Sequence, residues 1–144
     1  MPSINKAIQN ITPESFAKYG VILDFSPSFD GAFEILVREA EQPWRMAVYR
    51  PANRTCDCLE NHPTSMESFE PVRGTSLLIV AAHDTPNDFE IFLLDTPVCL
   101  HKGIWHNAVA LSDGVLIRVN ENLEVSSDFH NLHAPVGIRC IDTL

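Results

Sequence analysis

Apolar residues in this chain gather in short runs, and each run is bounded by turn-forming Gly, Pro or Asn residues. The spacing of these runs is near the ~8 to 12 residues that is typical of an all-β sandwich or barrel. The pattern predicts an all-β protein with strands at residues 21–25, 33–38, 45–49, 56–61, 68–72, 76–81, 89–94, 98–102 and 115–120, and with a further candidate at 136–141.

Three segments refine this pattern. The run over residues 75–82 is nearly continuous in apolar residues, which predicts a central strand covered on both faces. Thr12 before Pro13 supplies an N-cap hydroxyl and a first-turn proline, so a short helix begins there and ends by Gly20. The tail after Asn120 has weak periodicity, and we expect it to be an excursion that packs against a partner subunit.

Length and composition indicate one globular domain over residues 1–144, with 45% hydrophobic and 20% charged residues. The net charge of −9, with only 10 Lys and Arg residues, argues against a nucleic-acid partner. No apolar run approaches the ~20 residues of a membrane span, and the N-terminus lacks a signal pattern. We therefore expect a cytoplasmic protein with no membrane partner, in which a local cation attracts any anionic substrate.

Four cysteines raise the question of a zinc site. Cys56 and Cys58 share a strand face, but Cys99 and Cys140 lie singly and far away along the chain, so they do not form the second close pair of a typical zinc site. Reduced cysteines that act as small apolar residues fit this spacing better.

Candidate chemistry lies in two segments. Glu60 and His62 are two residues apart, so in a strand they project from the same face. Glu67 follows shortly after them, and a strand returning after Gly103 brings His106 toward the same interior. These side chains predict one interior site.

The spacing of the two segments carries a resemblance. His62 is followed by four intervening residues and Glu67, and then by six more and Gly74, while Gly103 stands three residues before His106. This spacing resembles the two metal motifs of the cupin superfamily. Glu60 stands where the first of two paired histidines is usual.

Within the cupins, the chain is most similar to the ureidoglycolate lyase family. The similar segments are Leu-Glu-Asn-His-Pro at 59–63, Ser-Phe-Glu-Pro at 68–71, Lys-Gly-Ile-Trp-His at 102–106 and Ile-Thr-Pro-Glu-Ser-Phe at 11–16. The resemblance implies a cupin-like β-barrel, also described as a double-stranded β-helix or jelly roll, with a short N-terminal helix. It also implies a homodimer and an enzyme that releases urea and glyoxylate from ureidoglycolate in purine and allantoin breakdown.

Two positions depart from the family pattern. Glu67 stands where the family usually carries Gln, which makes the site more like that of a metal-binding cupin. Asn107 and Ala108 stand where the family has a second His followed by Pro, which removes a polar group that serves the lyase chemistry.

The reaction implied by the resemblance needs a base, an acid and a cation for the substrate carboxylate. His62 and His106 are the candidate base and acid, because imidazole exchanges protons near neutral pH. Lys102 is the first candidate for the cation, with Arg50 and Arg118 as alternatives and Trp105 as a possible pocket wall. Ordinary surface charges at strand ends explain Lys102 and Arg118 about as well.

Glu60, His62, Glu67 and His106 also form a candidate set of metal ligands. Two imidazoles with one or two carboxylates suit one divalent ion such as Mn, Fe, Ni or Zn, and no nucleotide cofactor is expected. Two competing functions stay open: a metal-binding cupin that acts on or binds another small hydroxy or keto acid or a sugar, and a catalytically silent barrel.

Overall fold

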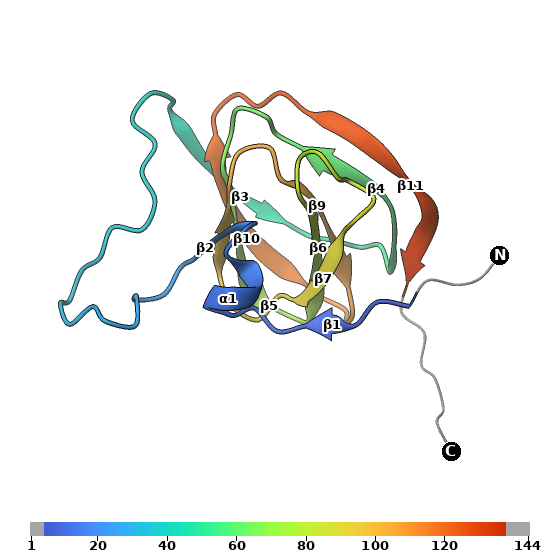
Figure 1. Ribbon diagram of the computed structural model, residues 1–144, viewed down its shortest axis with the longest axis horizontal. Coiled ribbons are helices and arrows are strands. Elements are labelled where there is room, and N and C mark those ends of the chain that lie inside the picture. Colours follow the sequence, from blue (N-terminus) through green and yellow to red (C-terminus); the bar gives the residue numbers. More distant parts are fainter. Residues whose placement is uncertain (1–4, 138–144) are drawn as a thin grey trace, which may run out of the picture.

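The computed structural model describes residues 5–137, which form two facing β-sheets around a common interior (Figure 1). Neighbouring strands are antiparallel except for the parallel pair of β1 and β7. The first sheet has the spatial order β1 (Ile8–Gln9), β7 (Glu90–Leu93), β6 (Ser76–Ala81), β9 (Trp105–Ala110), β4 (Thr55–Asn61) and β11 (Asp128–Gly137). The second has the order β2 (Gly20–Ile22), β8 (Val98–Leu100), β5 (Glu67–Arg73), β10 (Leu116–Asn122) and β3 (Trp44–Tyr49).

This arrangement confirms the predicted all-β, cupin-like fold with one short helix among the described residues. The helix α1 (Pro13–Phe16) begins at the predicted N-cap, where the Thr12 hydroxyl accepts a hydrogen bond from the Ser15 backbone. The Ser15 hydroxyl in turn accepts from the Thr12 backbone, which closes a capping box. No helix in the described part of the chain is long and apolar enough to cross a membrane.

Two apolar clusters hold the first sheet from both sides. The interior cluster joins residues of both sheets, with Phe92 of β7, Leu78 of β6 and Ile117 of β10 fully buried. On the outer face of the first sheet, Leu77 and Ile79 belong to a second cluster. All six residues of β6 are buried, so the predicted central strand with two covered faces is confirmed.

The strand predicted at residues 33–38 is wrong. These residues lie in a connection between β2 and β3 that extends to one side of the barrel (Figure 1). Phe33 and Ile35 alternate as a strand requires, but they are exposed, and the segment pairs with no other described strand. A strand needs a partner edge as well as an alternating pattern.

The tail after Asn120 is not an irregular excursion for most of its length, and its packing against a partner subunit stays a prediction. Residues Asp128–Gly137 form β11, which pairs antiparallel with β4 of the same chain. The pairing shifts register between Asn131 and Val136, and this irregularity weakened the strand signal in the sequence. Of the predicted strand at 136–141, only residues 136–137 lie within the described part of the chain.

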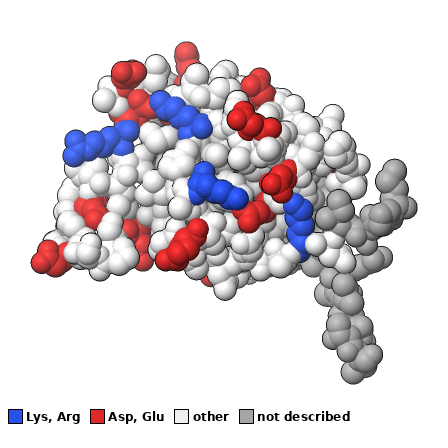
Figure 2. Space-filling model, in the orientation of Figure 1, with Lys and Arg blue, Asp and Glu red and all other residues white. Residues whose placement is uncertain are grey.

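Charges and cysteines add little to the architecture. Figure 2 shows acidic and basic side chains interspersed over one face of the molecule, without a basic stripe. Cys56, Cys58 and Cys99 are free, and within residues 5–137 no cysteine belongs to a group that could hold a metal ion. Cys140 lies outside the described residues.

Candidate active site

Two cross-strand pairs face each other at one end of the interior. In the first sheet, Glu60 of β4 lies directly opposite His106 of β9. In the second sheet, Glu67 of β5 lies directly opposite Glu121 of β10. Because side chains of directly opposed residues project to the same face, each pair presents its two groups together.

His62 joins the two pairs. It follows the last residue of β4, and its Nε2 atom lies 3.2 Å from Glu67 Oε2, 3.7 Å from Glu121 Oε2 and 3.8 Å from Glu60 Oε1. His106 Nε2 lies 2.8 Å from the same Glu67 oxygen. The structure therefore brings together all four residues that the sequence placed in one interior site.

Backbone carbonyl groups fix the orientation of both imidazole rings. His106 Nδ1 lies 2.9 Å from the carbonyl oxygen of Ile104, and His62 Nδ1 lies 3.1 Å from that of Ser126. A carbonyl oxygen only accepts hydrogen bonds, so these contacts favour the tautomer with a proton on Nδ1 in both rings, and the Ser127 hydroxyl lies 3.2 Å from the same His62 atom. In a neutral ring, Nε2 would then present its lone pair to the Glu67 carboxylate, which is repulsive. Protonation of Nε2, or a cation between Nε2 and the carboxylates, removes this repulsion.

The two carboxylates of the second sheet are only partly compensated. Glu67 and Glu121 are 9% and 7% exposed, and like charges directly opposite each other destabilise a sheet. Arg45 of β3 neutralises one side of Glu121, with its Nη2 atom 2.7 Å from Oε1. The Oε2 atoms of Glu67 and Glu121 have no partner with hydrogen-bond geometry among the described residues, although both lie within ion-pair distance of His62.

These contacts shift the proton affinities of the site. Burial alone would lower the pKa of His62, but the adjoining Glu67 carboxylate outweighs it and raises that pKa from 6.5 to about 9. Burial likewise opposes charge on His106, whose pKa is nevertheless raised by Glu67. For Glu67, burial favours the neutral form, but His106 and His62 lower its pKa to about 2. Without another cation in the site, the cluster holds its charges as carboxylate and imidazolium.

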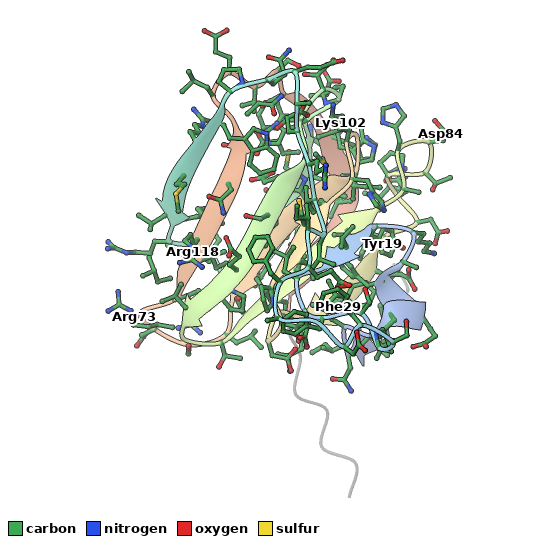
Figure 3. The ribbon with its side chains drawn as sticks, turned by 90° about the vertical axis from the view of Figure 1, so that its left-hand side faces the viewer. Tyr19, Phe29, Arg73, Asp84, Lys102 and Arg118 are labelled. Carbon is green, nitrogen blue, oxygen red and sulfur yellow. The ribbon has the colours of Figure 1, made fainter. Side chains whose placement is uncertain are left out.

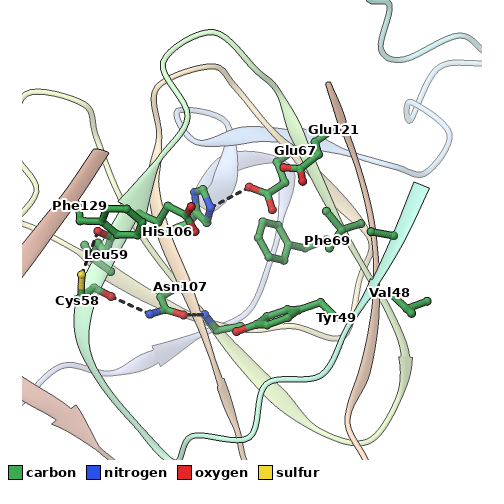
Figure 4. A pocket seen from close by; sticks show the side chains of 14 residues that line it. Val48, Tyr49, Cys58, Leu59, Glu67, Phe69, His106, Asn107, Glu121 and Phe129 are labelled. Carbon is green, nitrogen blue, oxygen red and sulfur yellow. Dashed lines mark hydrogen bonds and ion pairs between the residues drawn. The ribbon is translucent and has the colours of Figure 1, made fainter. Parts of the chain in front are cut away.

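A cavity of about 430 Å³ opens beside the cluster (Figure 4). Glu60, Glu67, Glu121 and His106 all line it. His62 is not among the lining residues, because its ring packs behind Glu67 against the Ser126 carbonyl. The prediction that four side chains line one pocket is therefore correct for Glu60, Glu67 and His106, and His62 lies immediately behind the wall.

The sequence matches the family model described as ureidoglycolate lyase over residues 4–135. The chain belongs to the ureidoglycolate lyase family. A search of curated proteins found no match to this sequence. The family resemblance read from the motifs is thus confirmed over most of the chain.

The cationic side chains that sequence analysis assigned to the substrate lie elsewhere, and no Lys or Arg lines the cavity within the described residues. Lys102 Nζ pairs with a Glu39 oxygen at 3.1 Å. Arg118 lies between two buried residues of β10, so it faces the outer side of the sheet, where it pairs with Glu70 (Figure 3). Arg50 is exposed just after β3.

Trp105, the predicted pocket wall, faces away from the cavity. It precedes His106 in β9, and its Nε1 atom donates a hydrogen bond to the His83 carbonyl oxygen at 2.8 Å. Its ring contacts that of His130. Adjacent strand residues face opposite sides of a sheet, so Trp105 and His106 cannot both line the cavity.

Sequence reasoning missed Glu121, Tyr49 and Phe129, which all line the cavity. Glu121 lies beyond the family motifs, and only its period-two relation to the buried Val119 could have placed it inside. The strand that carries Tyr49 was predicted, but it was not assigned which of its residues face the interior.

A divalent metal ion is implied by the cupin fold, and the residues present fit one. The ligand atoms of His62, Glu67 and Glu121 lie within 4.8 Å of one another, and so do those of Glu60, His62 and His106. The first set contains both carboxylate oxygens that lack hydrogen-bond partners, and a metal ion bound there would neutralise their charge. Imidazole and carboxylate ligands suit Mn, Fe, Ni or Zn.

Proposed function

We propose that this pocket converts ureidoglycolate to glyoxylate and urea. Membership of the ureidoglycolate lyase family supports the reaction class. The observation that carries the proposal is the cross-strand pair of Glu60 and His106 on the cavity wall, a carboxylate and an imidazole that face one space.

In the proposed step, Glu60 accepts the proton of the substrate hydroxyl. The electron pair of that O–H bond forms the carbonyl of glyoxylate, and the carbon–nitrogen bond breaks. His106, protonated at Nε2, donates its proton to the departing nitrogen, which leaves as urea. Acceptor and donor atoms of Glu60 and His106 lie within 4.8 Å of each other, so the proton can return from Glu60 to His106 through one bridging water molecule for the next cycle.

His62, Glu67 and Glu121 take a separate task in this proposal. They would hold the divalent ion, while Glu60 and His106 stay free for proton transfer. Such an ion would supply positive charge for the anionic substrate. Such a charge is needed in a cavity whose walls carry three carboxylates and no Lys or Arg within the described residues.

The test is an assay of urea and glyoxylate with purified protein, in the presence of each candidate divalent ion and in the presence of a chelator. We expect the two products in equal amounts, faster than the uncatalysed reaction. Ammonia in place of urea would mean a different reaction, and no product above background would overturn the proposal.

A second function is favoured by one observation. Glu67 stands where the family usually has Gln, and it adds a buried charge that a metal ion would neutralise. A metal-binding cupin that acts on another small hydroxy or keto acid fits this change. Stoichiometric metal without urea release would support this second function, and neither metal nor turnover would leave a silent barrel.

A further inference from the structure

The cavity has more room than the proposed substrate occupies. At about 430 Å³ it falls in the range of pockets that hold drug-sized ligands, whereas ureidoglycolate is only a two-carbon acid joined to one urea unit. Two of the three carboxylates of the cavity lie together on one side. Figure 4 shows Glu67 and Glu121 on that side and Tyr49 on the other, with the ring of Phe69 between them.

The far side of the cavity is apolar. Tyr49 and Phe69 provide aromatic surface there, and Ala47, Ala108 and Val119 add aliphatic surface. Phe129 adds a third ring beside Glu60, its cross-strand neighbour, and 67% of this residue is exposed. A wall of this kind favours a ligand that removes apolar surface from water.

The few polar groups on the far side offer little to a urea group. The Asn107 amide nitrogen donates to the Cys58 carbonyl oxygen at 2.7 Å, and its amide oxygen accepts from the Ala108 backbone at 2.8 Å. The Tyr49 hydroxyl also lines the cavity and offers a single polar atom on this wall. A urea group placed there would lose more hydrogen bonds to water than one hydroxyl can replace.

We infer that the pocket takes 2-hydroxy or 2-oxo acids that carry an apolar substituent, with the acid group at the Glu67 and Glu121 side and the substituent against Tyr49 and Phe129. The inference rests on the proposed function for the placement of the acid group, and it extends the substrate class beyond ureidoglycolate.

The experiment compares the binding of glycolate and mandelate by calorimetry, with the protein at one fixed metal content. Both are 2-hydroxy acids, and mandelate adds a phenyl ring. We expect mandelate to bind at least about tenfold more tightly, because burying part of one ring contributes about 25 cal/mol per Å² of apolar surface. Equal affinities, or no binding of either acid, would overturn the inference.

Two variants show which side chains cause the tighter binding of mandelate. Tyr49→Ala and Phe129→Ala should each reduce the preference for mandelate several-fold, while Tyr49→Phe keeps the ring and should keep the preference. Phe33→Ala is the matched control, because Phe33 is 83% exposed and does not line the cavity. If Tyr49→Ala disturbs edge strand β3, the test rests on Phe129→Ala, because Phe129 is largely exposed and its truncation should leave the fold intact. A preference unchanged in Phe129→Ala and Tyr49→Ala would contradict the placement.

Urea release from ureidoglycolate, measured on the same samples, separates this inference from the proposed function. Tight mandelate binding without urea release would leave the inference standing and remove the lyase reaction. Urea release with equal binding of glycolate and mandelate would do the reverse.

Discussion

Strand β5 carries two carboxylates three residues apart, Glu67 and Glu70, and they meet opposite environments. Glu70 lies on the outer face of its sheet, where both oxygens are bound by Arg118, Asn120 and Ser68. Glu67 faces the interior, where its Oε2 atom lies near two imidazoles but has no hydrogen-bond partner among the described residues.

The difference separates a structural network from a candidate binding site. The outer network satisfies its own groups, so it needs no ligand. The inner cluster places two buried carboxylates, Glu67 and Glu121, and the partly exposed Glu60 near two histidines, and its charges balance only if the rings stay protonated or a cation is bound. Buried groups that a fold leaves unsatisfied cost stability, and such a cost is typical of functional sites.

We expect substitutions in the inner cluster to have their largest effect on turnover. Glu60→Gln and His106→Ala should each lower kcat/KM for ureidoglycolate by ~10² to 10⁴, because each removes one partner of the proton transfer. His130→Ala is the control, since that ring contacts Asn87 and Trp105 outside the cavity. Equal losses in all three variants would point to damaged folding instead of chemistry.

Metal affinity should depend on the carboxylates of the inner face and not on that of the outer face. Glu121→Gln removes an anionic ligand and should weaken Mn or Zn binding at least ~10-fold in a competition titration. Glu70→Gln is the matched control on the outer face and should bind the metal as the wild type does. If Glu60→Gln weakens metal binding as much as Glu121→Gln, the ion is held instead by the set of Glu60, His62 and His106.

Glu67→Gln sharpens the choice between the two candidate functions. The family's usual residue is restored, so a lyase that works without the ion should keep its urea release. A lyase that needs an ion held by His62, Glu67 and Glu121, or another metal-dependent enzyme, should lose both the metal and its activity. Urea release and metal content, measured together on this variant, decide between them.

The stability of the metal-free protein should depend on pH through the same cluster. The pKa of His62 is raised from 6.5 to about 9, so its contribution is complete below pH 6.5 and is lost as the pH rises toward 9. The pKa of Glu67 is lowered from 4.5 to about 2, so its contribution is complete above pH 4.5 and is lost as the pH falls toward 2.

The free energy of unfolding should therefore be highest between about pH 4.5 and 6.5 and should fall by up to about 3 kcal/mol as the pH approaches 9. Urea denaturation at a series of pH values measures this. Glu67→Gln should flatten both slopes, and Glu70→Gln should leave them in place. An alkaline slope that survives in Glu67→Gln would assign it to another group.

The smallest effect belongs to the outer network. Arg118 is half exposed and pairs with Glu70 at 3.0 Å, and such surface pairs contribute about 1 kcal/mol or less. Arg118→Ala should lower the free energy of unfolding by no more than that, and less in high salt. A loss comparable with that of the inner cluster would remove the distinction between the two faces.

The sequence predicted the strands and the site residues that local pattern controls. Glu60, His62, Glu67 and His106 followed from period-two geometry and motif spacing, and the structure brings them together. The cationic residues failed to appear in the cavity because a one-residue change of register turns a side chain outward, as Arg118 illustrates beside Ile117 and Val119.

Other features depend on contacts between distant segments. Glu121 enters the site only because β10 pairs with β5 in the observed register, which no local pattern reveals. The same holds for β11, whose irregular pairing with β4 places Phe129 beside Glu60. Alternation without an available partner edge explains the failed strand at 33–38.

The most direct test of the account follows the imidazole nitrogens by NMR while glyoxylate is added to the purified protein. We expect the signals of His62 and His106 to move, because the reaction product binds beside their rings, while those of His83 and His130 stay in place. In Glu60→Gln, the His62 and His106 signals should stay in place only if this variant no longer binds glyoxylate. Unmoved His62 and His106 signals at saturating glyoxylate would contradict the claim that this cluster is the site of lyase chemistry.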